Sequence, residues 1–127
     1  MREVVLDSSA VLALMFEEPG QDIVSAHRIG AMISTVNLGE VLTRLVERGQ
    51  SLEESLSLVT PLRLTAVDHS QSHAAISASL RPATKHLGLS YGDRACLSLA
   101  IEQQRRILTT DRVWGDLNLG IDIQVIR

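Results

Sequence analysis

Four acidic side chains stand where they could form one cluster. Asp7 and Asp111 directly follow short apolar runs. Glu40 and Asp93 each lie in the first turn of a predicted helix. Two like charges about 4 Å apart repel by about 4 kcal/mol at an effective dielectric of about 20, so such a cluster needs protons, basic partners or a metal ion. Oxygen-only ligands suit Mg²⁺ or Mn²⁺, which can activate water and stabilise charge on a phosphoryl group. The four acids therefore predict metal-assisted hydrolysis of a phosphodiester.

Each acid also has a purely structural explanation. Asp7 and Asp111 can cap the helices that follow them. Asp93 can complement the dipole of the helix that it opens. Glu40 stands three residues after Asn37, the spacing of a capping box. It also points away from the apolar stripe of its helix, which favours a solvated face and makes it the weakest of the four candidates.

The segment "GLSYGD" at 88–93 contains the G-x-S-x-G pattern of a serine nucleophile. In serine hydrolases with this pattern, the histidine of the catalytic triad follows the serine in the chain, and a strand directly precedes the serine's turn. Here all four histidines precede Ser90, and the residues before Gly88 look helical. We therefore favour Asp93 over Ser90 as the reactive group.

His69 and His73 have the i, i+4 spacing of two zinc ligands on one helix. The segment lacks the glutamate of H-E-x-x-H, and no third ligand is evident. We expect this pair to lie in a solvated first helical turn.

The elements that position the acids alternate β-branched runs with helical stretches. Strands are expected at 3–6, 31–36, 62–67, 106–110 and 121–126. Helices are expected at 8–18 (with Ser8 or Ser9 as N-cap), at 21–29, at 37–49, after a capping box at 51–54, at 70–86 with a break at Pro82, and at 93–104. This alternation indicates an α/β fold with a parallel sheet covered on both faces. Ligands of such sheets bind at the carboxyl ends of the strands, where the four acids stand.

The composition narrows the class of protein. The 127 residues suit one domain, 1–127, and 45% of them are hydrophobic, enough for a packed core. The net charge of −3 gives no overall attraction to nucleic acid. The aromatic residues are Phe16, Tyr91 and Trp114 only, which disfavours a platform of stacked aromatics. No segment resembles a signal peptide or a transmembrane helix, so we expect a cytoplasmic protein without membrane contact.

Four segments resemble the signature blocks of the PIN-domain ribonucleases, and more narrowly the VapC toxins of toxin–antitoxin pairs. They are "VLDSSAVLALMFEEPG", "STVNLGEVLTRL", "LSYGDRACLSLA" and "ILTTDRVW", and the resemblance spans about residues 3 to 126. It implies a three-layer α/β/α fold with a central, mainly parallel sheet, and a Mg²⁺- or Mn²⁺-dependent endoribonuclease that cleaves tRNA or rRNA. It also implies a homodimer that a VapB-like antitoxin holds inactive. By position, the family's acids match Asp7, Glu40, Asp93 and Asp111, its hydroxyl matches Thr109, and Asp116 stands where some members have a further acid.

Two hypotheses remain open from the sequence. The first is the nuclease; the second is a non-catalytic PIN-like binding module whose acidic pocket is degenerate. RNA phosphates would need cations beside the acids, and the candidates are Arg44, Arg48, Arg94, Arg105, Arg106 and Arg112. An antitoxin helix would need an apolar groove, and the candidates are Leu12, Met15, Phe16, Leu52, Leu56 and Val59.

Overall fold

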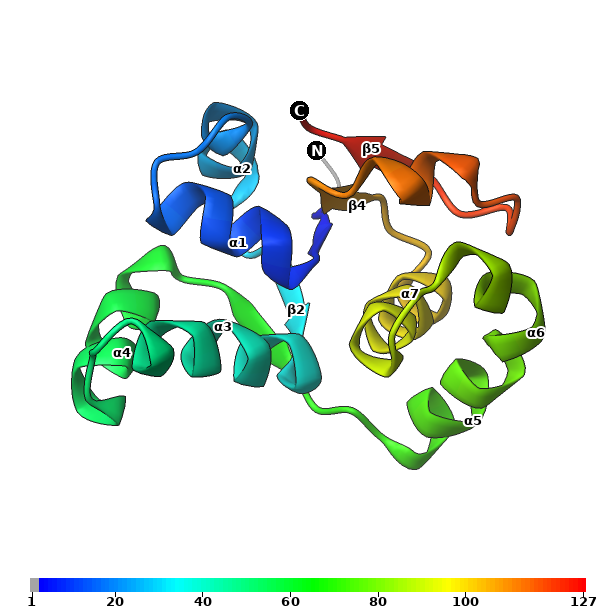
Figure 1. Ribbon diagram of the computed structural model, residues 1–127, viewed down its shortest axis with the longest axis horizontal. Coiled ribbons are helices and arrows are strands. Elements are labelled where there is room, and N and C mark those ends of the chain that lie inside the picture. Colours follow the sequence, from blue (N-terminus) through cyan, green and yellow to red (C-terminus); the bar gives the residue numbers. More distant parts are fainter. Residues whose placement is uncertain (1–2) are drawn as a thin grey trace.

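A computed structural model describes residues 3–127 and contains one five-stranded parallel sheet (Figure 1). The strands are β1 (Val5–Leu6), β2 (Met32–Ser34), β3 (Thr65–Val67), β4 (Ile107–Thr109) and β5 (Ile123–Val125). Their order across the sheet is β3-β2-β1-β4-β5, and every neighbouring pair is parallel. The predicted α/β class and parallel sheet are confirmed, although each strand is shorter than its apolar run.

Helices cover both faces of the sheet. The α-helices are α1 (Ser8–Met15), α2 (Gln21–His27), α3 (Thr35–Glu47), α4 (Leu52–Val59), α5 (Gln71–Ser79), α6 (Arg81–Thr84) and α7 (Tyr91–Gln103). Three 3₁₀ helices complete the chain: η1 (Thr60–Leu62), η2 (Lys85–Leu87) and η3 (Arg112–Asp116). Figure 1 shows α1 to α4 on one side of the sheet and α5 to α7 on the other, which is the predicted three-layer arrangement.

The core divides into two apolar clusters, one on each face of the sheet. Leu6 and Leu108 belong to the cluster under α1, α2 and α3. Val5 and Ile107 belong to the cluster under α7. Successive strand residues thus point to opposite faces, as the pleat requires. Because both faces are buried, the central strands read as continuous apolar runs rather than as alternating patterns.

Several predicted boundaries are wrong, and a local hydrogen bond explains the shift at the start of α3. Ser34 ends β2, and its side chain accepts a hydrogen bond from the amide of Val36, so α3 begins at Thr35. The predicted cap of the first helix is also wrong, because the N-cap of α1 is Asp7 and not Ser8 or Ser9. The capping box at 51–54 is confirmed, as is the break at Pro82, which lies at the start of α6. Within residues 3–127, no helix is long and apolar enough to cross a membrane.

Candidate active site

Asp7 lies at the carboxyl end of the central strand β1 and is only 3% exposed. It does not use its side chain to cap α1, so the capping explanation is wrong for this residue. Its Oδ2 atom accepts hydrogen bonds from Ser9 Oγ at 2.6 Å and from Thr109 Oγ1 at 3.0 Å. Its Oδ1 atom is buried and has no hydrogen-bond partner in the described structure. The carboxylate is therefore held through one oxygen while the other stays free.

Burial raises the pKa of the Asp7 carboxyl from 3.8 to about 6. The hydrogen bonds from Ser9 and Thr109 oppose this rise, and the charges of Asp93 and Glu40 add to it. Such a shift marks a carboxylate whose charge the protein itself does not neutralise.

Two hydroxyls connect the end of β1 to the end of β4. Thr109 is fully buried, donates to Asp7, and accepts a hydrogen bond from the amide of Asp111 at 3.1 Å. Ser9 donates to Asp7 and accepts from the amide of Thr110 at 3.1 Å. Thr109, which the resemblance matched to the family's hydroxyl, therefore bonds directly to Asp7. Sequence reasoning missed Ser9, whose only signal was its position two residues after Asp7.

Asp93 lies in the first turn of α7 and forms a capping box with Ser90. Its Oδ2 atom accepts from the amide of Ser90 at 2.9 Å, and the Ser90 hydroxyl accepts from the amide of Asp93 at 3.1 Å. Burial raises the pKa of Asp93, the bonds to Ser90 lower it, and the charges of Glu40 and Asp111 raise it. Ser90 acts as a helix cap, and the 3₁₀ turn before it is no strand, so the structure contradicts a serine nucleophile elbow.

The structure corrects the interpretation of Glu40. Because α3 begins at Thr35, Glu40 lies in the second turn, and Asn37 is no N-cap. The buried Asn37 amide instead donates to Glu40 Oε1 at 2.8 Å and to the carbonyl of Gly92 at 2.9 Å. A Cβ atom on Gly92 would clash with Glu40 Oε2. Glu40 is half-buried against the start of α7 and does not lie on a solvated face.

Asp111 precedes the 3₁₀ helix after β4 and Asp116 is the last residue of that helix, and both are exposed. Asp111 Oδ1 caps this helix by accepting from the amide of Val113 at 3.1 Å, so the capping explanation holds for this acid. Its charge nevertheless contributes to the raised pKa of Asp93. Asp116 makes no hydrogen bond or ion pair to the other acids within residues 3–127.

The four acids gather around the carboxyl ends of β1 and β4 and the start of α7. The buried thiol of Cys96 belongs to the apolar cluster under α7. Burial raises its pKa, and the charges of Asp7, Asp93 and Glu40 raise it further. No three acidic, histidine or cysteine side chains of residues 3–127 are already arranged so that they could hold one metal ion. The donors nevertheless fit a hard cation. They are all oxygens, and the protein's hydrogen bonds engage one oxygen of each acid.

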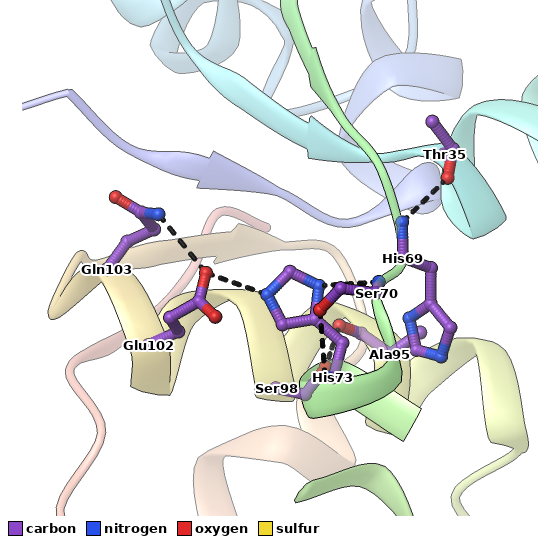
Figure 2. A network of polar contacts seen from close by, with 8 residues as sticks. All are labelled: Thr35, His69, Ser70, His73, Ala95, Ser98, Glu102 and Gln103. Atoms are coloured by element: carbon purple, nitrogen blue, oxygen red, sulfur yellow. Dashed lines mark hydrogen bonds and ion pairs between the residues drawn. The ribbon is translucent and has the colours of Figure 1, made fainter. Parts of the chain in front are cut away.

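The prediction that His69 and His73 lie in a solvated first helical turn is wrong. His73 is 2% exposed because α5 packs on α7, and its Nε2 atom lies 2.7 Å from Glu102 Oε1 (Figure 2). Its Nδ1 atom accepts from the amide of Ser70 at 3.3 Å and completes a capping box. His69 turns away and contacts Tyr91 Oη at 2.8 Å. Both rings therefore have protein partners that local spacing did not reveal.

Most of the predicted arginines are engaged away from the acids. Arg48 lies 3.9 Å from the centre of the Phe16 ring, and Arg106 pairs with Asp122 at 2.9 Å. Arg105 and Arg106 precede β4 and line a hollow of 710 Å³ at the amino ends of the strands. A hollow of 520 Å³ lies nearer the acids, and Glu40 and Arg44 both line it.

Comparisons with known proteins identify a family and a fold. A family model of the PIN domain matches residues 4–118. The DNA-bound VapBC of Salmonella typhimurium contains a chain with 18% identity, a TM-score of 0.73, and coverage of 98% of each chain. A toxin–antitoxin complex from Klebsiella pneumoniae gives 19% identity, a TM-score of 0.73 and the same coverage. VapC20 of Mycobacterium tuberculosis, a Sarcin-Ricin loop cleaving toxin, gives 14% identity and a TM-score of 0.72 over 87% of this chain and 91% of that one. No curated protein matches.

Proposed function

The chain belongs to the PIN-domain family, and from this premise we propose that it is a metal-dependent endoribonuclease toxin. Its one nuclease domain, residues 1–127, would hydrolyse phosphodiester bonds in RNA, with tRNA or an rRNA loop as the expected target. A VapB-like antitoxin would neutralise it in the cytoplasm.

One observation carries the proposal: the environment of Asp7. This carboxyl is buried and has a pKa of about 6, and its Oδ1 atom has no partner within the described structure. A buried carboxylate that lacks a positive partner is costly, and the chain retains three further acids beside it. A cation from outside the chain explains both features.

Asp7 and Asp93 would hold a Mg²⁺ or Mn²⁺ ion, with Glu40 and Asp111 contributing at the rim. When bound, such an ion lowers the pKa of water and stabilises charge on a phosphoryl oxygen.

The chain's own residues orient the donors. Ser9 and Thr109 fix Asp7 Oδ2, so that Oδ1 faces away from them. The amide of Ser90 fixes Asp93, and Asn37 fixes Glu40 against Gly92. These supporting bonds keep the carboxylates in place without occupying their second oxygens.

The test is RNA cleavage by purified protein in Mn²⁺, with chelator as the negative control. We expect cleavage that requires metal and is lost in Asp7→Asn. Sequencing the RNA ends produced after induced expression would identify the target. Cleavage that persists in chelator, or in folded Asp7→Asn, would contradict the proposal.

The partner is proposed separately. Leu52 and Leu56 on α4 are 58% and 45% exposed, whereas Leu12, Met15 and Phe16 pack partly against the core. We propose that the α1 and α4 surface receives an amphipathic antitoxin helix and that the toxin is a homodimer. Polar substitution of Met15 and Leu56 should weaken antitoxin binding in folded protein, and unchanged affinity would place the groove elsewhere.

The second candidate is a non-catalytic binding module. It is favoured by the exposed position of Asp111 and by the lack of a ready metal-binding set within residues 3–127. Thermal melts separate the two candidates: millimolar Mn²⁺ should raise the melting temperature of the nuclease and leave that of the module unchanged.

A further inference from the structure

Tyr91 is the one aromatic residue that is well exposed in the described structure. Trp114 is 1% exposed, and Phe16 is half-buried beneath the guanidinium of Arg48. Tyr91 is 45% exposed. The exposed part of this ring is open to a ligand.

Tyr91 is a neighbour in the chain of residues that belong to the acidic site. Tyr91 is the first residue of α7, two positions before Asp93. The next residue, Gly92, lies directly against the carboxylate of Glu40. Two positions along a helix point about 200° apart, so the ring lies beside the acids and not among them. An RNA strand that continues past the acids along the start of α7 can therefore meet this ring.

Contacts from two sides hold the ring in place. The Tyr91 hydroxyl lies 2.8 Å from His69 Nε2, and the two rings meet edge to face with centres 5.5 Å apart. The amide of His69 donates to Thr35 Oγ1 at 3.0 Å, which ties this segment to the start of α3 (Figure 2). Arg94 Cζ lies 5.3 Å from the ring centre, and Arg94 Nη1 donates to the carbonyl of Ser77 at 2.9 Å. Both supports are themselves fixed, so the ring is preorganised.

We propose that Tyr91 stacks on an unpaired base of the RNA, with Arg94 behind the ring and His69 at its edge. The inference rests on the proposed function, since it assigns the base beside the cleaved phosphate. Protein side chains read RNA chiefly by stacking on bases of single-stranded loops and ends. A cation on the far side of an aromatic ring adds to such stacking. With only three aromatic residues in the chain, one base is stacked rather than a series.

Tyr91 is the only tyrosine, so 3-fluorotyrosine labels this position alone and gives one ¹⁹F resonance. The experiment uses the full chain with Asp7→Asn, in Mg²⁺, so that a short single-stranded RNA is bound but not cut. We expect the RNA to shift the resonance and an abasic oligomer of equal length to leave it nearly unchanged. Equal shifts with both oligomers, or none with either, would overturn the inference.

Affinity for a fluorescein-labelled RNA provides the second measurement, in the same background. Stacking of one base, about 1–3 kcal/mol, corresponds to about 5- to 150-fold in Kd. Tyr91→Ala should lose this factor, whereas Tyr91→Phe should stay within about threefold of the parent because it keeps the ring face. Leu58→Ala is the matched control, since Leu58 is 46% exposed on α4. A Tyr91→Ala affinity equal to that of the control, or a Tyr91→Phe loss as large as that of Tyr91→Ala, would refute stacking.

The two proposals fail separately. If the wild type cleaves RNA in Mn²⁺ while the resonance stays still, only the stacking inference fails. If RNA shifts the resonance and Tyr91→Ala weakens binding while the wild type never cleaves, the nuclease proposal fails and the base-binding site stands.

Discussion

Asp7→Asn tests the electrostatic cost that the acidic pocket imposes on the fold. The native pKa of Asp7 is raised from 3.8 to about 6. Each tenfold change in an equilibrium constant is about 1.36 kcal/mol, so charging this buried carboxyl costs the native state on the order of 3 kcal/mol. In metal-free protein the variant should avoid that cost.

The sign of the pH dependence follows from the direction of the pKa change. Below about pH 4 Asp7 is protonated in both states and imposes no cost. As the pH rises towards about 6, the unfolded chain ionises first, so the wild type loses stability relative to Asp7→Asn. Above about pH 7 the difference should reach its plateau on the order of 3 kcal/mol. The amide also leaves an unpaired donor where Oδ1 stands, which adds a penalty that does not vary with pH.

The assay is urea unfolding of both proteins in chelator, from about pH 4.5 to about pH 8. Asp116→Asn is the matched control: this exposed acid should change the free energy of unfolding by no more than about 0.5 kcal/mol at any pH. Mn²⁺ at about 100 times its Kd should then add about 2.7 kcal/mol to the wild type and much less to Asp7→Asn. A difference between wild type and Asp7→Asn that stays constant with pH would refute the reasoning.

Three further substitutions and one chemical modification probe the rest of the site. Asp93→Asn should abolish Mn²⁺-dependent RNA cleavage in a protein that circular dichroism shows to be folded. Ser90→Ala should lose only a helix cap, about 1 kcal/mol, and keep most cleavage; the opposite pattern would revive the serine hypothesis. Gly92→Ala would push the Glu40 carboxylate aside, so RNA cleavage should fall. Thermal stability should hold, because alanine is a better helix former than glycine by about 1 kcal/mol. Undiminished cleavage would mean that Glu40 is not part of the site. The Cys96 thiol is fully buried and burial raises its pKa, so a disulfide reagent should modify it only after unfolding, and rapid reaction in native buffer would contradict the core position.

Short-range signals in the sequence predicted the fold well. The predicted capping box at Ser51 depends on a partner three residues away, and it is present in the structure. The box at Ser90 was not predicted, and α7 begins at Tyr91 rather than at Asp93. The positions of Asp7 and Asp111 at strand ends follow from apolar runs of a few residues. These features are visible in sequence because every interacting group lies within one turn of helix or one strand.

Long-range contacts could not be predicted in the same way. Asn37 bonds to the carbonyl of Gly92, 55 positions away, and this contact turns Glu40 from a surface acid into a pocket acid. His73 is buried by its contact with Glu102 on α7, so its local sequence suggested only a surface helix turn. Such pairings depend on how α3, α5 and α7 pack, which no window of local sequence contains.

The charge balance of the pocket argues for a cation from outside the chain. The ion pairs of residues 3–127 join Arg44 to Glu47, His73 to Glu102, Arg106 to Asp122 and Arg127 to Glu18. In that part of the chain, then, none of the four pocket acids pairs with a basic side chain. The bonds that the acids do accept come from hydroxyls, amides and one carboxamide, which orient a carboxylate without cancelling its charge. A fold that orients four carboxylates and leaves their charge uncompensated is less stable alone than with a divalent ion, and this difference is the quantity that the Mn²⁺ titration of the wild type measures.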